Sequence, residues 1–211
     1  SIVAHKRLTQ EREQDMQVLK LLILQQVKVG GMELLRQMYN QMDKGKITDI
    51  QLVENFFDDI DLILKIAAQQ KYYPVDESNF KTGSCATWPG VRTLCLDLKP
   101  DINNLIRHYA EKRFNLFNSD GAFFFHKKGI KDKHKDWKHK DPVKQSLIVY
   151  LSKTNTDSGT VFYNDNGDVI TDIGFVQNRA ICFNGRIPHQ SKLNYGKDDE
   201  MRLTLNGFFY D

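Results

Sequence analysis

Residues 178–191 read NRAICFNGRIPHQS, a strand-like run, RAICFNG, followed by a turn and then by His189. Similar runs lie in the same half of the chain, namely AFFFHK, SLIVYLS, GTVFYN, DVITDIGFV and RLTLNGFFYD. Each run is rich in β-branched and aromatic residues, and tight turns separate the runs. Many short strands of this kind are typical of two antiparallel sheets packed as a sandwich or jelly roll.

The region before these strands is mixed. VRTLCLDL (91–98) alternates as a strand does, and a helix is predicted from Pro100-Asp101 through DINNLIRHYAEKRF. The stretch YYPVDESNFKTGS (72–84) is punctuated by Pro, Ser, Gly and Asp, so it is predicted as a loop or linker.

Residues 1–71 have helical periodicity instead. Apolar residues follow helical spacing in 18–24 and again in 34–42. A capping box at Thr48 and Gln51 predicts a third helix that runs through VENFFDDIDLILKIAAQQ, with its aspartates on a solvated face. We therefore expect an α+β protein in which a helical region, 1–75, packs on a double-sheet β domain, 76–211.

The overall composition is that of an ordinary globular protein. The 211 residues are 40% hydrophobic and 27% charged, and the formal net charge of +3 is too small to indicate nucleic acid by itself. The three cysteines, Cys85, Cys95 and Cys182, form no CxxC pair, which favours neither a disulfide framework nor a zinc knuckle and suits a reducing cytoplasm. The most apolar run, 19–27, is too short to span a membrane.

The stretch HKDWKHKD (134–141) contains His-Lys-Asp twice. A histidine and a carboxylate two positions apart point to the same side of an extended chain, which suits binding of one metal ion. An isolated triplet would more simply be a charged, solvated loop. Here, however, His189 follows a strand downstream, and Arg202 opens the last strand.

This order of residues suits a particular chemistry. Two histidines and one carboxylate can occupy one face of an octahedral metal, the arrangement that selects Fe(II) in oxygenases. A guanidinium on a neighbouring strand can hold the far end of a dicarboxylate through two parallel hydrogen bonds.

The ordered set WPGVR (88–92), WKHKD (137–141), LIVYLS, SGTVFY, NRAICFNGRIPH and RLTLNGFFYD resembles the 2-oxoglutarate- and Fe(II)-dependent oxygenases, which have the double-stranded β-helix fold. The resemblance is greatest to the prolyl-hydroxylase-like branch, especially its small members from phages and marine bacteria. It spans roughly residues 86–211 and does not explain the helical half.

The resemblance implies roles for individual residues. His189 corresponds to the second iron histidine, and Arg202 to the arginine that binds the C5 carboxylate of 2-oxoglutarate. Tyr150 corresponds to a tyrosine that helps to hold that carboxylate in some relatives, and Thr204 shares the strand face of Arg202. Because both triplets keep an aspartate, the resemblance favours hydroxylation over halogenation. The implied cofactors are Fe(II), 2-oxoglutarate and O₂, with ascorbate as a further candidate.

Either triplet can supply the remaining ligands. His139 and Asp141 leave only PVKQ before the next strand, a connection of hairpin length that is similar to the phage-type members. His134 and Asp136 leave a longer loop, similar to the oxygen-sensing prolyl hydroxylases. The shorter spacing favours His139 and Asp141.

The surrounding segment, 126–141, contains seven lysines and three aspartates. It is either a solvated loop or a positive rim that attracts 2-oxoglutarate or an acidic substrate. Nucleic acid could also bind through residues 127–140. Trp137 would anchor this loop or stack on a substrate, and His126 is expected to face solvent at the end of a strand.

The expected activity is hydroxylation of a substrate with release of succinate and CO₂, and peptidyl proline is the favoured substrate. The alternatives are an oxygenase that acts on nucleic acid or a small molecule, and a non-catalytic β-helix protein with a binding or assembly role. The helices of 1–71 would then be candidates for forming an oligomer. The resemblance places such a protein in the cytoplasm of a bacterial cell or a phage-infected host.

Overall fold

The computed structural model describes residues 50–82, 87–114, 116, 120–129, 132, 136–192, 195–196 and 200–210. All of them belong to one compact unit, Ile50–Asp211. The helices predicted within 18–42, and with them any oligomer contact through this region, lie outside the described residues.

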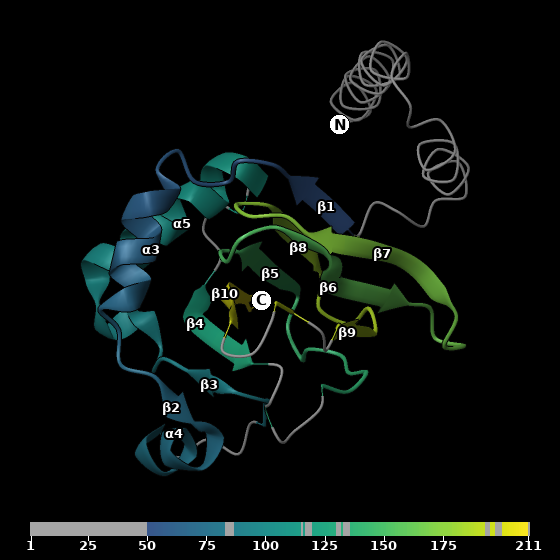
Figure 1. The fold of residues 1–211 in the computed structure, drawn as a ribbon, viewed down its shortest axis with the longest axis horizontal. Coiled ribbons are helices and arrows are strands. Elements are labelled where there is room, and N and C mark those ends of the chain that lie inside the picture. Colours follow the sequence, from purple (N-terminus) through teal and green to yellow (C-terminus); the bar gives the residue numbers. More distant parts are fainter. Residues whose placement is uncertain are drawn as a thin grey trace, which may run out of the picture. The chain divides into compact units, whose positions relative to one another are not determined.

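Two antiparallel sheets form the centre of this unit (Figure 1). The larger sheet has the order β1-β8-β5-β10-β4-β3-β2. Its strands are β1 (Ile50–Val53), β2 (Tyr73–Pro74), β3 (Val91–Arg92), β4 (Gly121–Gly129), β5 (Gln145–Tyr150), β8 (Ala180–Asn184) and β10 (Met201–Phe209). The smaller sheet, β7-β6-β9, consists of β6 (Asn155–Tyr163), β7 (Val169–Phe175) and β9 (His189–Ser191). The two predicted antiparallel sheets are thus confirmed.

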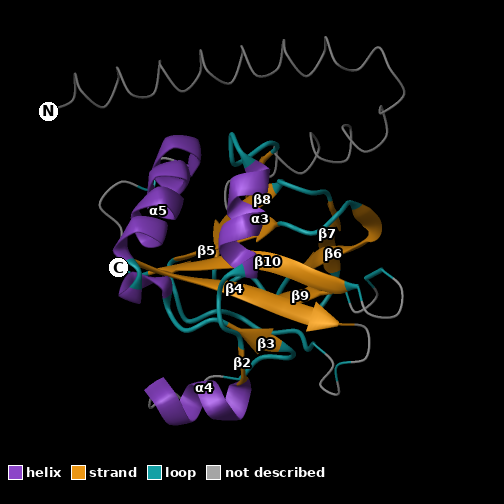
Figure 2. Cartoon of the chain, turned by 60° about the vertical axis from the view of Figure 1, so that its left-hand side comes forward, coloured by secondary structure: helices purple, strands orange, loops and turns teal. Residues whose placement is uncertain are grey.

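Strict alternation in the central strands gives the large sheet two apolar faces. In β5, Leu147 and Val149 pack in the core under the helices, whereas Ile148 and Tyr150 pack against aromatic residues of the small sheet. Because side chains of a strand alternate between its faces, one apolar run contributes to both cores. Helices α3 (Ile60–Ala68) and α5 (Pro100–Phe114) cover the face away from the small sheet (Figures 1 and 2).

The helix predicted from Thr48 onward is wrong in its first part. Ile50–Val53 is an edge strand that pairs with β8, with Ile50 opposite Phe183. The helix begins only at Ile60, after Asp59, whose Oδ1 accepts a hydrogen bond of 3.0 Å from the Leu62 N–H. Strand pairing with a distant segment here outweighs a local capping signal, because propensity is weaker than tertiary packing.

The connection between β1 and α3 contributes directly to the large core. Phe56 and Phe57 are both buried there. Asn178 fixes this connection, since its side chain accepts a 2.9 Å hydrogen bond from Phe57 N and donates one of 2.8 Å to Phe57 O. Residues 50–75, which sequence analysis grouped with the N-terminal helices, therefore share the core of the β sheets.

Two shorter predictions also differ from the structure. The segment 72–84, expected to be a loop, contains β2 and helix α4 (Val75–Thr82). Only Ser78 of α4 is buried and Phe80 is 91% exposed, so this helix lacks the apolar stripe that reveals helices in a sequence. The strand expected over 91–98 is limited to Val91–Arg92, and Leu96–Leu98 forms a 3₁₀ turn, η1.

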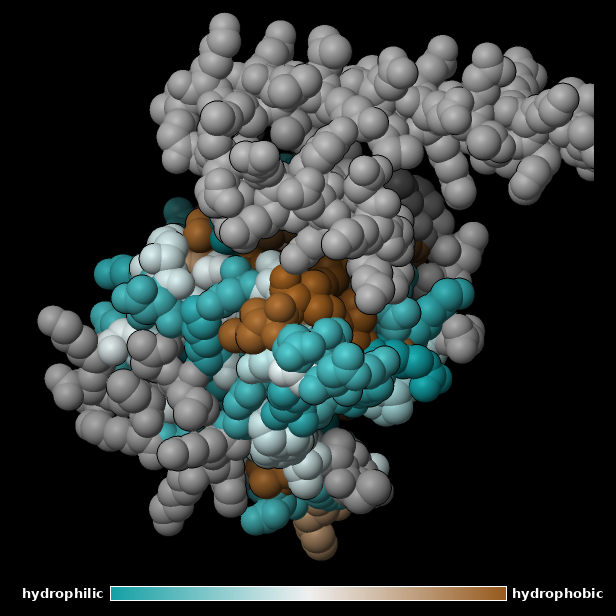
Figure 3. Space-filling model, turned by 90° about the vertical axis from the view of Figure 1, so that its right-hand side faces the viewer, coloured by the Kyte–Doolittle hydropathy of each residue, from teal (hydrophilic) through white to brown (hydrophobic). Residues whose placement is uncertain are grey.

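In the view of Figure 3, much of the coloured surface on the side of the small sheet is hydrophilic, and a hydrophobic patch lies near the middle. Within the described part of the chain, no helix has the length and apolar character that crossing a membrane requires.

The core position of the β1–α3 connection predicts a large effect of truncating Phe57. Phe57→Ala removes a fully buried ring and should lower the free energy of unfolding by about 3–5 kcal/mol. Denaturant unfolding measures this loss, with Phe80→Ala as the matched control, since Phe80 is exposed and its truncation should change stability by less than about 0.5 kcal/mol. Equal effects of the two substitutions would contradict the described packing.

Candidate metal centre

Backbone pairing brings two histidines from distant segments together. His139 and His189 form an isolated antiparallel bridge: the His139 N–H donates to His189 O at 3.0 Å, and the His189 N–H donates to His139 O at 2.9 Å. Two residues further on, the Asp141 N–H donates to Gly185 O at 2.7 Å. The segment that carries His139 and Asp141 is thereby held against the chain that leads from β8 into β9.

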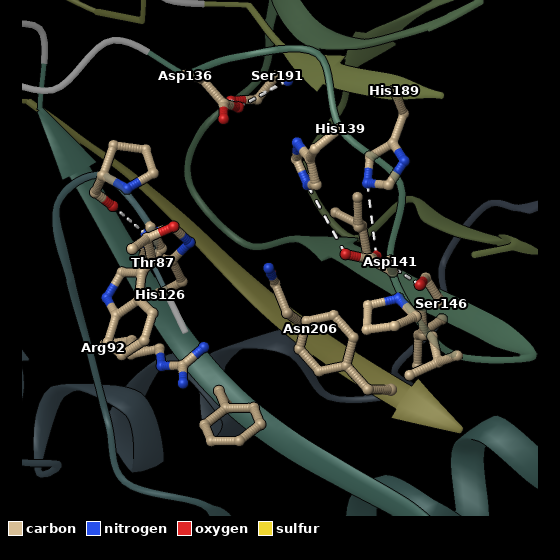
Figure 4. A pocket seen from close by; sticks show the side chains of 18 of the residues that line it. Thr87, Arg92, His126, Asp136, His139, Asp141, Ser146, His189, Ser191 and Asn206 are labelled. Atoms are coloured by element: carbon tan, nitrogen blue, oxygen red, sulfur yellow. Dashed lines mark hydrogen bonds and ion pairs between the residues drawn. The ribbon is translucent and has the colours of Figure 1, made fainter. Parts of the chain in front are cut away.

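The side chains of these three residues converge (Figure 4). Nε2 of His139 lies 3.7 Å from Asp141 Oδ1, and Nε2 of His189 lies 3.5 Å from Asp141 Oδ2. One donor atom from each residue lies within 4.8 Å of the other two. Two imidazole nitrogens and one carboxylate therefore face a common point, the donor set expected from the sequence.

The second nitrogen of each imidazole determines which tautomer is present. Nδ1 of His139 lies 2.8 Å from Trp137 O, and Nδ1 of His189 lies 2.9 Å from Ile187 O. A carbonyl oxygen can only accept, so each Nδ1 carries the proton and donates. In the neutral form of each ring, Nε2 then carries the lone pair that a metal-binding histidine requires.

Asp141 is oriented in the same way. Its Oδ2 accepts a 2.6 Å hydrogen bond from the Ser146 hydroxyl at the start of β5. Burial lowers the pKa of His189 below its usual value, although the neighbouring Asp141 acts in the opposite direction. Two imidazoles whose Nε2 atoms face a hydrogen-bonded carboxylate fit a divalent metal ion.

Asp136, the carboxylate of the competing triplet, lies elsewhere. Its Oδ2 accepts a 2.8 Å hydrogen bond from the Ser191 N–H and another from the Ser191 hydroxyl, and it forms a 3.7 Å ion pair with Lys128. The Asp136 carbonyl oxygen also accepts a 2.9 Å hydrogen bond from Gln190. Asp136 thus attaches the segment of His139 to the strand of His189. His134 lies outside the described residues.

Electrostatics explains why this ion pair is stable. Burial would raise the pKa of Asp136, but the charge of Lys128 and the hydrogen bonds from Ser191 hold that pKa below its usual value. Burial and the charge of Arg202 lower the pKa of Lys128 to about 8. Both side chains are therefore charged at neutral pH, and each compensates the other inside the protein.

Arg202 lies on the adjacent strand, β10, directly opposite Lys128 of β4. Its guanidinium is buried, and its Nη2 is 3.5 Å from Gly159 O, at the limit of a hydrogen bond. Its Nε is buried without any hydrogen-bond partner. Gly159 has a φ of +135°, and a Cβ at this position would clash with the Ile173 carbonyl oxygen, so the backbone here requires glycine.

Tyr150 and Thr204, which were predicted to bind the co-substrate beside Arg202, donate their hydroxyl hydrogen bonds to other side chains. The Tyr150 hydroxyl donates a 2.8 Å hydrogen bond to the Thr160 hydroxyl, and its ring centroid is 5.6 Å from the guanidinium carbon of Arg202. Thr204 is fully buried and donates a 2.8 Å hydrogen bond to Asn206 Oδ1. Neither belongs to the residues that line the pocket, so a direct contact of either with a ligand stays a prediction.

The three donors and Arg202 line the same pocket, which has a volume of about 630 Å³. Trp137, 42% exposed, also lies at this pocket. Ser146, Ser191 and Lys128 were missed by the sequence analysis, because their partners are distant in the chain and no local motif marks them.

The expectation for His126 is wrong, because its side chain faces the pocket from within β4 instead of facing solvent. Its Nε2 lies 2.5 Å from Pro89 O. Burial, together with the neighbouring cations, lowers its pKa to about 4.

The described lysines of 127–140 have partners within the protein. Lys127 lies over the ring of Tyr72, Lys138 over that of Tyr163, and Lys140 pairs with Asp165 at 2.8 Å.

The two triplets predict different responses of metal binding to mutation. Asp141→Ala should abolish specific Mn(II) or Zn(II) binding. Asp136→Ala should keep a site but weaken it by roughly 10- to 100-fold, because Asp136 only positions the ligand segment. Asp165→Ala, at an exposed carboxylate, is the control without effect. Calorimetric titration measures all three, and the reverse order of Asp141 and Asp136 would assign the site to the other triplet.

The buried His126 predicts a pH-dependent stability. Its pKa is about 4 in the folded protein against an ordinary value of 6.5, so between these values the unfolded chain binds more protons. The free energy of unfolding should therefore decrease as the pH is lowered from 6.5 to about 4, by up to about 1.4 kcal/mol per pH unit from this group. Unfolding curves of the wild type and of His126→Gln at pH 7 and pH 5 measure this change. If the free energy of unfolding changed by the same amount between the two pH values in both proteins, the burial of a neutral His126 would be contradicted.

Comparison with protein-family models and with curated protein sequences finds no match. Solved structures do match. An oxidoreductase of the 2OG-Fe(II) oxygenase family from Burkholderia pseudomallei has 10% identity and a TM-score of 0.55, covering 87% of this chain and 91% of that one. The non-heme alpha-ketoglutarate-dependent epimerase SnoN from nogalamycin biosynthesis has 14% identity and a TM-score of 0.53 (77% and 78% covered). A prolyl-4-hydroxylase from Pseudomonas putida has 16% identity and a TM-score of 0.50 (77% and 93% covered). The chain has the fold that these oxygenases share.

Proposed function

We propose that this chain is an Fe(II)- and 2-oxoglutarate-dependent oxygenase that hydroxylates its substrate. One observation carries the proposal: His139, Asp141 and His189 offer three donors to one point in a pocket that also contains the buried Arg202. A facial set of three protein ligands leaves three metal positions for a co-substrate and O₂. The fold is shared with structures described as a 2OG-Fe(II) oxygenase, a prolyl-4-hydroxylase and an alpha-ketoglutarate-dependent epimerase, which supports chemistry that uses the same co-substrate.

Arg202 is the residue that suits the co-substrate. The Nε of this buried guanidinium has no hydrogen-bond partner, and the carboxylate that acts on its charge, Asp136, is already ion-paired with Lys128, so the guanidinium is costly to bury until an anion binds it. The distal carboxylate of 2-oxoglutarate would supply two acceptor oxygens for this planar donor. The stacked rings of Tyr150 and Phe175 lie on one side of the guanidinium, with centroids 5.6 Å and 5.4 Å from Cζ, and would restrict its movement.

When bound, Fe(II), 2-oxoglutarate and O₂ would supply the oxidation, in which one oxygen atom enters succinate as CO₂ leaves and the other enters the substrate. His139 and His189 would provide neutral Nε2 donors that their Nδ1–H···O=C bonds keep in orientation. Asp141, held by Ser146, would provide the anionic donor. The surrounding aromatic and aliphatic residues would exclude water from the reacting groups.

Peptidyl proline is the first substrate to test, since one solved structure of this fold is described as a prolyl-4-hydroxylase. Nucleic acid is a weaker candidate, because each described lysine of 127–140 already has a partner within the protein.

Succinate formation tests the proposed reaction. Protein loaded with Fe(II) under air should convert 2-oxoglutarate to succinate, with stimulation by proline peptides if these are substrates. Arg202→Gln should raise the KM for 2-oxoglutarate by roughly 10- to 100-fold, because charge-assisted hydrogen bonds are lost. Arg186→Gln removes the same charge from an exposed position and is the matched control.

Two results would contradict the proposal. One is a KM for 2-oxoglutarate that Arg202→Gln leaves unchanged. The other is an Fe(II) affinity that is unaffected by His189→Ala. Stoichiometric Fe(II) binding without succinate formation, over a broad set of candidate substrates, would instead indicate a non-catalytic protein.

A further inference from the structure

A second arginine lines the same pocket on another wall. In the view of Figure 4, Arg92 lies across the pocket from His139 and His189. Its guanidinium carbon is 3.2 Å from the ring centroid of Trp88 and 4.5 Å from that of Phe124. Ring contacts of this kind use the flat face of a guanidinium and leave the N–H groups at its edge for other partners.

Two N–H groups on this wall lack an acceptor. Nε of Arg92 is buried without a hydrogen-bond partner, and so is Nε1 of Trp88 on the same wall. The ionisable groups that interact with Arg92 among the described residues are Cys95, Tyr210 and His126, none of them a carboxylate. Burial lowers the pKa of Arg92 to about 10, so the guanidinium is still charged at neutral pH. A buried charge of this kind is stabilised when a ligand supplies the missing acceptor.

Other charged residues that line the pocket are already compensated from outside it. Asp136 is paired with Lys128 at 3.7 Å. Lys140 is paired with Asp165 at 2.8 Å. These two pairs add no net charge to the pocket.

Among the described residues that line the pocket, the charges without such an ion pair are those of Arg92, Arg202 and Asp141. With a divalent ion and doubly negative 2-oxoglutarate in place, the ion and the co-substrate cancel, and so do Arg202 and Asp141. One positive charge remains, and it lies on Arg92. The filled pocket would thus favour a substrate that carries one negative charge.

We infer that Arg92 and Trp88 form an anion-binding subsite and that the substrate carries a carboxylate, which Arg92 binds while the reacting carbon faces the metal centre. This inference rests on the proposed function and narrows its substrate class to acids. Peptides whose only carboxylate is remote from the reacting residue would not fill this subsite.

Trp88 itself reports on the subsite. The chain has two tryptophans, so Trp137→Phe leaves Trp88 as the single indole fluorophore. In this background, with Zn(II) and 2-oxoglutarate bound and no turnover, benzoate and its neutral analogue benzamide are titrated as probes. Benzoate should change the Trp88 emission and bind at least tenfold more tightly than benzamide.

The variants separate this subsite from the rest of the pocket. Arg92→Gln should abolish the preference for benzoate, whereas affinities for Zn(II) and 2-oxoglutarate stay within about twofold, which also shows that the variant is folded. Arg92→Lys should restore part of the preference, because it keeps the charge but not the planar pair of donors. Arg186→Gln, which replaces an exposed arginine, should leave the preference for benzoate unchanged.

Equal affinity for benzoate and benzamide, or a benzoate preference that persists in Arg92→Gln, would overturn the inference. Tighter binding of phenyl phosphate than of benzoate would overturn the assignment to a carboxylate. Failure of the proposed function is seen separately, as a missing Zn(II) or 2-oxoglutarate titration. The comparison of benzoate with benzamide stands in that case too, since Arg92 is not one of the metal donors.

Discussion

The backbone bridge between His139 and His189 is the constraint on which the site depends. It joins the segment before β5 to the start of β9, and it places two imidazoles with ring centroids 4.4 Å apart. Because both Nδ1 atoms donate to carbonyl oxygens two residues back, the Nε2 lone pairs of both rings point toward Asp141. The donor set is therefore preorganised by hydrogen bonds of the fold, which reduces the entropy lost when an ion binds.

The positive charges in this pocket favour the binding of anions. The buried carboxylate of Asp136 neutralises Lys128 and holds the ligand segment, and within the described residues Arg202 forms no ion pair with a carboxylate. Arg92, on the other wall, has no carboxylate partner either among the described residues. A pocket with an acidic donor at the metal point and two unpaired guanidiniums suits one dicarboxylate co-substrate together with one acidic substrate.

The sequence predicted what depends on local pattern. Alternation in SLIVYLS and RAICFNG indicated strands with two buried faces, and the hairpin-length PVKQ favoured His139 and Asp141, which the structure brings to His189. Features that depend on distant pairing were not predictable. The capping box at Thr48 gave no sign that Ile50–Val53 would pair with β8, and Asp136 is 55 residues from its partner Ser191. Helix α4 was not predicted for a different reason. Its Phe80 is exposed, and a helix without a buried apolar stripe has no periodic signal in the sequence.

A crystal structure of the protein with Mn(II) and 2-oxoglutarate tests the central claim most directly. Anomalous scattering should locate one Mn(II) ion bound by Nε2 of His139, Nε2 of His189 and the carboxylate of Asp141. The keto-acid end of 2-oxoglutarate should complete the coordination of that ion, and the distal carboxylate should contact Arg202. An ion bound by Asp136 instead, or a dicarboxylate that binds away from Arg202, would contradict the account.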